Sequence, residues 1–371
     1  MTALMTADLD TSRLLTTTGP VASLYLGMAD NLDGIAHERA LRWRGLRDQL
    51  ASQGADEATL AALADAVDSL GPTDVALAAF AADGRVVAQR QVAERFGDRG
   101  LWSSLPCVLP LLAYEQRAVP CVVALADRTG ADLRVEMDGS RIYAEVEGTD
   151  DEIERNAPGG WSQRRYQDRA EDSWAHNAAK VAEAVTRLSD QMDAEVVALG
   201  GDVRAVQLVR EHLPPRVSTL VHQLTHGSRH PSRGDRRHEQ EVRDLVSALV
   251  HSRTSGLLSR LAEDRAHGRA VEGTAATLDV LAKSQAQTLV VVDDPRDDRV
   301  AWFGPDPVDV AAQPATLASL VGSPSHGRLA DVAVRAALGT GATVHVLRPG
   351  LADKPADGLA ALLRYPRGSG Q

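Results

Sequence analysis

Hydrophobic and polar positions in the first third of the chain form two kinds of pattern. Short continuous apolar runs are typical of buried strands, while apolar residues three or four positions apart are typical of amphipathic helices. The expected elements are a strand at 21–26, helices at 35–50 and 57–70, and strands at 75–80 and 86–92. Asp83-Gly84 lies between the last two runs and favours a hairpin turn. We therefore expect residues 1–116 to form a small α/β domain.

The middle third combines strands with one long helix. Strands are expected at 119–125, 131–136, 141–147 and 196–199, with a shorter helix at 203–213. The long helix is predicted by a stripe of residues at helical spacing: Tyr166, Ala170, Trp174, Ala178, Val181, Val185 and Leu188. We place a second domain at 117–228, with a mixed sheet covered by helices.

The last third begins after a polar, basic segment rich in helix breakers at 226–238, which we interpret as a linker. Helices are expected at 239–265, 274–283 and 329–338, with strands at 286–292 and, as the final strand, 342–347. This pattern predicts a compact α/β sandwich at 229–371. The chain as a whole is thus expected to be an α/β protein of three domains.

Composition and charge exclude several classes of protein. The 371 residues are 44% hydrophobic, which rules out fibrous and wholly disordered chains. Only three of the 40 basic residues are lysines, and a GC-rich genome explains this better than selection for phosphate binding. The net charge of −11 argues against a general nucleic-acid coat but permits a local basic surface.

No signal peptide or apolar run of ~20 residues is visible, so we expect a cytoplasmic protein with no membrane association. Cys107 and Cys121 have no metal-binding spacing and are expected to be reduced thiols. No residue pattern predicts a cofactor or a metal ion.

The sharpest local feature is the segment that leads into the long helix. Two adjacent glycines allow close backbone approach, and the helix start behind them attracts phosphate. An aromatic ring at such a tip can stack on a base. The candidate RNA-binding residues are Gly159, Gly160, Trp161, Ser162, Gln163, Arg164, Arg165 and Arg169. An ordinary surface loop followed by a solvated helix start is the alternative interpretation.

With Asn177 and Val181-Ala-Glu-Ala184 further along the helix, this segment resembles the middle domain of archaeal and eukaryotic class-1 peptide-chain release factors. The three-part layout also resembles Pelota, and in particular the bacterial branch that includes actinobacterial relatives of the hibernation factor Balon. The resemblance implies a ribonuclease-H-like middle domain and an L7Ae-like C-terminal domain.

Two departures from the family pattern affect the expected activity. Trp161 occupies the position of the family's hydrolytic glutamine, where a bulky indole would obstruct the approach of water. The Asn-Ile-Lys-Ser and Tyr-x-Cys motifs used for reading stop codons are absent from the N-terminal part. No catalytic residue is therefore assigned.

The resemblance implies a monomeric ribosome-binding factor that occupies the vacant A site. Its partners would be 23S rRNA near the peptidyl-transferase centre, the 30S decoding centre and, for delivery, elongation factor Tu. Such a factor would inhibit or protect ribosomes under stress without peptide release. The alternative is a rescue enzyme, either a peptidyl-tRNA hydrolase or a nuclease, in which Gln163, Arg164 or Arg165 assists hydrolysis.

Four other groups are weaker candidates. His222, His226, His230 and His238 have helical metal spacing interrupted by breakers, so solvated linker histidines are favoured over zinc. The neighbouring arginines 229, 233, 236 and 237 could contact rRNA or belong to a plain linker. Arg39, Arg42, Arg44 and Arg47 around Trp43 are interpreted as an exposed helix face rather than a basic binding surface. The aspartates at 293, 294, 297 and 298 are interpreted as an acidic turn rather than a Mg²⁺ site.

Overall fold

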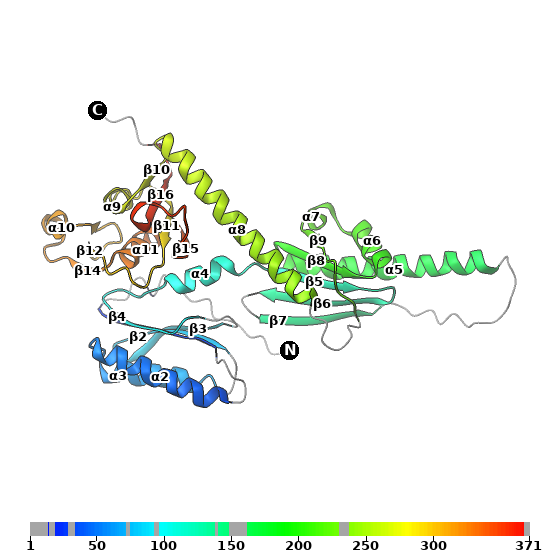
Figure 1. Ribbon diagram of the computed structural model, residues 1–371, viewed down its shortest axis with the longest axis horizontal. Coiled ribbons are helices and arrows are strands. Elements are labelled where there is room, and N and C mark those ends of the chain that lie inside the picture. Colours follow the sequence, from blue (N-terminus) through cyan, green and yellow to red (C-terminus); the bar gives the residue numbers. More distant parts are fainter. Residues whose placement is uncertain are drawn as a thin grey trace. The chain divides into compact units, whose positions relative to one another are not determined.

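A computed structural model describes most of the chain (Figure 1). The described residues are 14, 19–28, 34–71, 75–92, 96–137, 140–147, 162–229 and 237–366. They divide into two compact units. The first unit combines residues 1–116 with residues 253–371, and the second contains residues 117–252. The boundaries of the three predicted domains remain predictions.

The N-terminal part of the first unit is an antiparallel sheet between two helical layers. Its order is β3-β2-β1-β4, formed by β1 (Val21–Leu26), β2 (Ala76–Ala82), β3 (Arg85–Val92) and β4 (Arg99–Ser103). Asp83 and Gly84 both have positive φ, as the predicted hairpin turn requires. The helices are α2 (Ile35–Ser52) and α3 (Glu57–Asp68) on one face and α4 (Leu109–Arg117) on the other.

The C-terminal part of the first unit contains two sheets. The larger has the order β10-β16-β11-β15, formed by β10 (Ala270–Glu272), β11 (Ala286–Val292), β15 (Thr343–Leu347) and β16 (Leu359–Leu363). The smaller comprises β12 (Val300–Phe303), β13 (Val310–Ala311) and β14 (Ser325–Arg328). The helical elements are α9 (Thr274–Ala282), α10 (Pro314–Val321), α11 (Leu329–Gly339) and the short turn η2 (Ala356–Gly358).

The expectation that 342–347 is the final strand is wrong. β16 follows it and lies inside the larger sheet, between β10 and β11. Its sequence, Leu-Ala-Ala-Leu-Leu, is a short apolar run in which neither strand nor helix periodicity stands out. Pairing with two neighbouring strands decides its conformation.

The second unit is a five-stranded mixed sheet with the order β7-β6-β5-β8-β9. Its strands are β5 (Cys121–Ala126), β6 (Gly130–Met137), β7 (Ser140–Glu147), β8 (Val196–Gly201) and β9 (Val221–Gln223). The core of one face includes residues of α5 (Ser162–Gln191), α6 (Val203–His212) and α7 (Pro215–Ser218). The mixed α/β architecture predicted from the sequence is confirmed.

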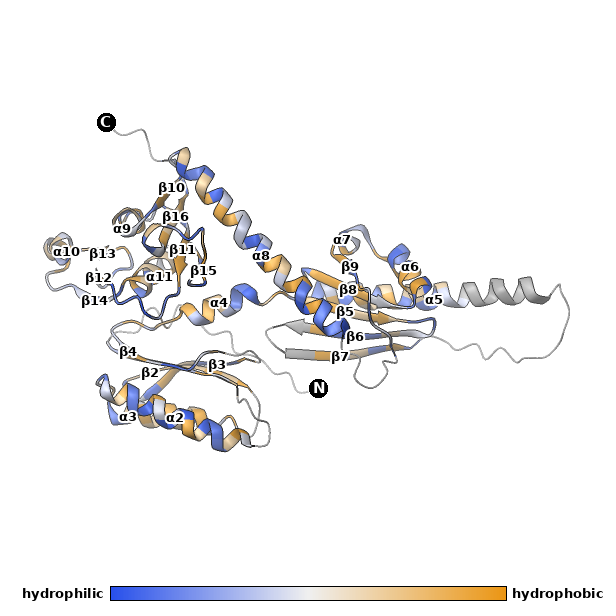
Figure 2. Cartoon of the chain, in the orientation of Figure 1, coloured by the Kyte–Doolittle hydropathy of each residue, from blue (hydrophilic) through white to orange (hydrophobic). Residues whose placement is uncertain are grey.

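Helix α8 (Arg237–Ala266) crosses the boundary between the units at Ser252 and Arg253. Its first half packs Val242 and Leu245 against the second unit's sheet. Its last half packs Leu257 and Leu261 in the first unit. Hydrophobic and hydrophilic residues alternate along α8 (Figure 2), as expected for a helix with two separate packing surfaces.

Cys107 and Cys121 are buried thiols that do not form a disulfide with each other. Among the helices of the described ranges, none is long and apolar enough to cross a membrane.

Candidate functional site

Helix α5 begins with most of the residues that the sequence singled out. Gly159, Gly160 and Trp161 lie outside the described residues. The others, Ser162 to Arg165 and Arg169, fall in the first turns of α5. The side chains of the helix are described from Ser173 onward, and the first buried one is Asn177. By helix geometry, Ser162 lies about 22 Å along the axis from that packing point.

A tight turn between β5 and β6 lies where α5 begins to pack on the sheet. A carboxylate oxygen of Asp127 accepts hydrogen bonds from the amides of Thr129 (2.8 Å) and Gly130 (2.9 Å) and from the Thr129 hydroxyl (2.7 Å). Burial acts to raise the pKa of Asp127, but the hydrogen bonds from Thr129 outweigh it and lower the pKa. The turn therefore presents its next residue, Arg128, in a fixed position.

Arg128 connects this turn to two helices. Its carbonyl accepts a hydrogen bond from Nδ2 of Asn177 at 3.1 Å. Its guanidinium lies over the indole ring of Trp174, 4.5 Å from the ring centroid. Its Nε is 3.8 Å from Asp202, which caps the start of α6. We call Arg128, Trp174 and Asn177 the α5 base, because together they hold α5 where it meets the sheet.

Arg229, predicted as a linker or RNA-contacting residue, is instead bound by side chains of the second unit's sheet and of the β5–β6 turn. Its side chain is only 8% exposed and its Nε lies 3.0 Å from Asp132. It also pairs with Glu145 and Asp127 and donates to Thr129 Oγ1 at 3.0 Å. A guanidinium with so many partners inside the protein is not available to RNA. The interpretation of Arg229 as an RNA contact is therefore wrong.

The four histidines do not behave as one group. His222 is exposed on β9, His230 lies outside the described residues, and His226 approaches Glu241 at 3.4 Å. His238 is buried, so its interpretation as a solvated linker residue is wrong. The reason is that α8 begins at Arg237, inside the segment interpreted as linker. Within the described ranges, no three His, Cys, Asp or Glu side chains are grouped as metal ligands.

Glu241, in the first turns of α8, forms hydrogen bonds with Thr225 and His226, which precede the helix. Its carboxylate accepts hydrogen bonds from the amide and hydroxyl of Thr225, at 2.7 and 2.6 Å, and from the amide of His226 at 3.1 Å. Burial acts to raise the pKa of Glu241, but these hydrogen bonds prevail and lower it to about 2. Residues 225 and 226 are therefore held to the first turns of α8.

Most of the arginines around Trp43 are engaged within the protein. Arg39 is buried and donates to the carbonyl of Gly71, while Arg42 pairs with Asp98 and Glu38. Arg47 pairs with Glu57, and Arg44 is exposed. The interpretation as an exposed helix face therefore holds for Arg44 but not for buried Arg39. Little of this surface remains for an anionic partner.

Sequence reasoning missed Arg128 completely. Trp174 was assigned to the apolar stripe of the long helix, and nothing local indicates that an arginine in a distant turn would cover it. The Asp-Arg-Thr-Gly sequence predicts the turn but not the partner of its arginine.

Residues 120–267 match the family model described as bacterial archaeo-eukaryotic release factor family 2. The resemblance of this part of the chain to the release-factor superfamily is thereby confirmed. The uncharacterized protein Rv2629 of Mycobacterium tuberculosis strain H37Rv is 29% identical over 364 residues, covering 95% of each chain.

Two solved structures cover much of the chain at low identity. An archaeal translation termination factor is 15% identical, with 96% of each chain covered and a TM-score of 0.25. Pelota of Archaeoglobus fulgidus is 14% identical, with 80% of this chain and 81% of that chain covered and a TM-score of 0.35.

Proposed function

We propose that this release-factor-like protein binds the vacant A site of the bacterial ribosome, from the decoding centre to the peptidyl-transferase centre. There it inhibits or protects the ribosome under stress without releasing the peptide. One observation carries the proposal: the residue after Gly159-Gly160 is Trp161 rather than the family's hydrolytic glutamine. A chain that keeps the surrounding segment but lacks this side chain is suited to occupancy, not to hydrolysis.

The form of the second unit supports this role. The family match over residues 120–267 includes residues 159–165, which we call the tip, and the rest of α5. The tip leads into the first turns of α5, and the contacts of Arg128 with Trp174 and Asn177 hold the helix where it meets the sheet. Free amides at the helix start and the arginines that follow would attract the phosphates of 23S rRNA. Delivery by elongation factor Tu belongs to the same proposal.

Cosedimentation with ribosomes tests the binding step. The full chain is expected to migrate with ribosomes from starved cells at low salt and to dissociate in part as salt rises, because phosphate contacts weaken with ionic strength. A protein found only in the free fraction at both salt concentrations would overturn the proposal.

A pair of matched variants tests the tip. Trp161→Ala combined with Arg165→Ala is expected to weaken association with the 50S subunit by an order of magnitude or more, given ~1–3 kcal/mol for a stacked base. Arg187→Ala is the control, since Arg187 is an exposed arginine in the last turns of the same helix. Equal affinity for both variants would remove the tip from the interface.

A release assay separates this proposal from a rescue enzyme. Ribosomes carrying peptidyl-tRNA are incubated with the full chain, and no peptide or cleaved tRNA is expected above background. Trp161→Gln, which restores the family's side chain at this position, serves as the comparison. Efficient release or tRNA cleavage by the parent chain would favour the enzyme and contradict occupancy without hydrolysis.

A further inference from the structure

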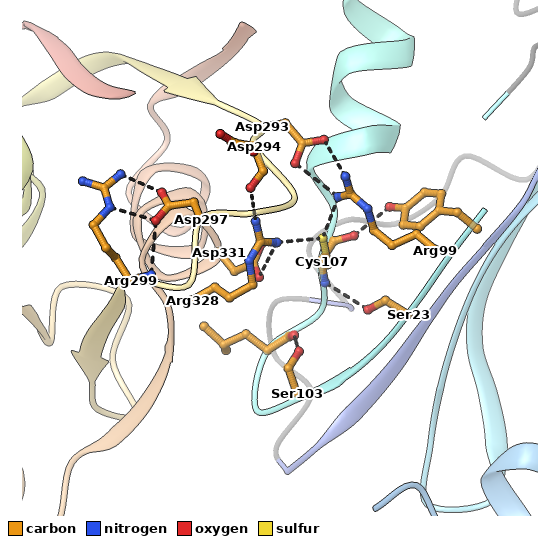
Figure 3. A network of polar contacts seen from close by, with 12 residues as sticks. Ser23, Arg99, Ser103, Cys107, Asp293, Asp294, Asp297, Arg299, Arg328 and Asp331 are labelled. Carbon is orange, nitrogen blue, oxygen red and sulfur yellow. Dashed lines mark hydrogen bonds and ion pairs between the residues drawn. The ribbon is translucent and has the colours of Figure 1, made fainter. Parts of the chain in front are cut away.

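A polar cluster lies between the N-terminal and C-terminal parts of the first unit (Figure 3). Arg99 and Cys107 come from the N-terminal part, at β4 and just before α4. Asp293 follows β11, and Arg328 and Asp331 lie at the end of β14 and the start of α11. We call these five residues the polar joint.

The contacts across the joint are directional. Arg99 places both terminal nitrogens on the carboxylate of Asp293, at 3.2 and 3.4 Å. Arg328 approaches the sulfur of Cys107 at 3.4 Å and the carboxylate of Asp331 at the same distance. Arg99 reaches that sulfur at 3.6 Å. Each part thus contributes a guanidinium that bonds a group of the other part.

The joint is well shielded from solvent. The side chains of Arg99 and Asp293 are 20% and 14% exposed, and that of Asp331 is 1% exposed. Burying charged groups costs free energy that pairing only partly returns. An apolar core shared by the two parts, which includes Tyr25, Leu109 and Leu329, already supplies the hydrophobic stabilisation. Buried ion pairs of this kind add little net stability, but a hydrogen-bonded polar network can rigidify the groups that it joins.

Side chains beside the joint reinforce the same connection. The side-chain amide of Gln116 pairs with the backbone of Val346 in the way that a neighbouring strand would. Its oxygen accepts a hydrogen bond from the Val346 amide at 2.8 Å, and its nitrogen donates one to the Val346 carbonyl at 3.1 Å. Val346 lies on β15, an edge strand of the larger C-terminal sheet. Ser104 donates to the carbonyl of His326 on β14. The N-terminal part is thus hydrogen-bonded to two C-terminal strands.

We propose that the polar joint locks the N-terminal sheet and the C-terminal sandwich into one rigid body with a single relative orientation. The apolar core provides attraction without direction, whereas the paired guanidinium and carboxylate groups of Arg99 and Asp293 fix the angle. This device acts in the free protein and does not depend on ribosome binding.

Spin-label distances measured by electron paramagnetic resonance on the full chain test the lock. Labels are attached at Asp65→Cys on α3 and Lys283→Cys at the end of α9, since both native residues are exposed. The two native thiols are buried, and burial raises the pKa of Cys107 to about 12, so labelling is selective. A narrow, single distance distribution is expected.

Removing the charge at the joint is expected to broaden this distribution at least twofold. The variant is Asp293→Asn, which keeps the size of the side chain. Glu57→Gln is the matched control, because it removes the pairing of Glu57 with Arg47 at the surface of the N-terminal part. Exchanging the charges in the double variant Arg99→Asp, Asp293→Arg is expected to restore much of the narrow width.

Amide exchange in β2 and β11 accompanies each variant to show that both parts stay folded. Broadening with intact protection in both strands supports the lock. If Asp293→Asn and Arg99→Ala both leave the width at the parent value, the proposal is overturned. It is equally overturned if the width grows only when β2 or β11 loses protection, since that is unfolding rather than release of a joint.

Discussion

The guanidinium of Arg128 lies over the indole ring of Trp174, 4.5 Å from the ring centroid. A cation in this position over an aromatic ring contributes ~0.5–1 kcal/mol when exposed and more when desolvated. Here it joins the β5–β6 turn to α5 at the point where the helix meets the sheet, beside the hydrogen bond from Asn177 to the carbonyl of Arg128. The direction in which α5 leaves the sheet depends on this contact.

Arg128→Ala is therefore expected to loosen the α5 base. Amide exchange in the segment around Trp174 should accelerate about five-fold, the equivalent of ~1 kcal/mol. Exchange in β8, which lies in the sheet core, should stay unchanged. Arg204→Ala, at an exposed arginine in the first turn of α6, is the control. Identical exchange in both variants would show that Arg128 does not hold the helix.

Arg229→Met is expected to destabilise the second unit by about 1–3 kcal/mol, because it leaves Asp127, Asp132 and Glu145 without their shared cation. The partial exposure of these carboxylates keeps the loss below that of a fully buried pair. Exchange protection of β6 in the full chain measures it. Arg216→Met, which removes an exposed pair with Asp190, should change protection little.

Glu241→Gln is expected to remove a pH-dependent part of stability. The folded pKa of Glu241 is about 2, below the ordinary value of 4.5. The folded state therefore favours the carboxylate, and the stabilisation is complete above pH 4.5 and lost as pH falls towards 2. Parent and variant should differ in melting temperature near pH 6 and converge near pH 2. The same difference in melting temperature at every pH in this range would contradict the lowered pKa of Glu241. Glu263→Gln, at an exposed residue of α8, is the control.

Asp331→Asn is expected to act with the opposite sign. Burial raises the pKa of Asp331 from 3.8 to about 7, against the opposing effect of Arg328 and with Asp293, Arg99 and Cys107 also facing it. Between these values the folded state holds a proton that the unfolded state has lost, so stability falls as pH rises from about 4 to about 7.

The variant should lack this decline, which is on the order of a few kcal/mol in the parent. Its advantage in melting temperature should therefore be larger at pH 8 than at pH 4.5. Asp353→Asn, at an exposed position of the C-terminal part, should follow the parent at both pH values. A parallel pH profile for Asp331→Asn and parent would show that Asp331 does not titrate in this range.

Elements with strong local signals were predicted well, and those without them were missed. The hairpin at Asp83-Gly84 and helix α5 follow from turn chemistry and from a stripe of apolar residues. β4 and β16 were missed, because short runs such as Arg99–Ser103 have no period of their own. Their pairing with β1 and β11, respectively, decides their conformation.

The same distinction applies to the candidate site. The candidate residues from Gly159 to Arg165 could be singled out because they form a contiguous segment, and their role remains a prediction. Arg229 was misinterpreted, because its three carboxylate partners, Asp127, Asp132 and Glu145, lie roughly a hundred positions earlier in the chain. His238 was misinterpreted because the start of α8 had been placed two residues too late.

The sequence by itself determined the alternation of strands and helices, the amphipathic character of α5 and the hairpin turn at Asp83-Gly84. These features are carried by neighbouring residues, so local periodicity and composition are sufficient to read them. Only the tertiary structure decided that the guanidinium of Arg128 lies over the ring of Trp174 and that Arg99 forms a salt bridge with Asp293. A long charged side chain can pair with any opposite charge or aromatic ring that the folded chain brings close to it. The spacing of residues along the sequence therefore does not specify which pair forms.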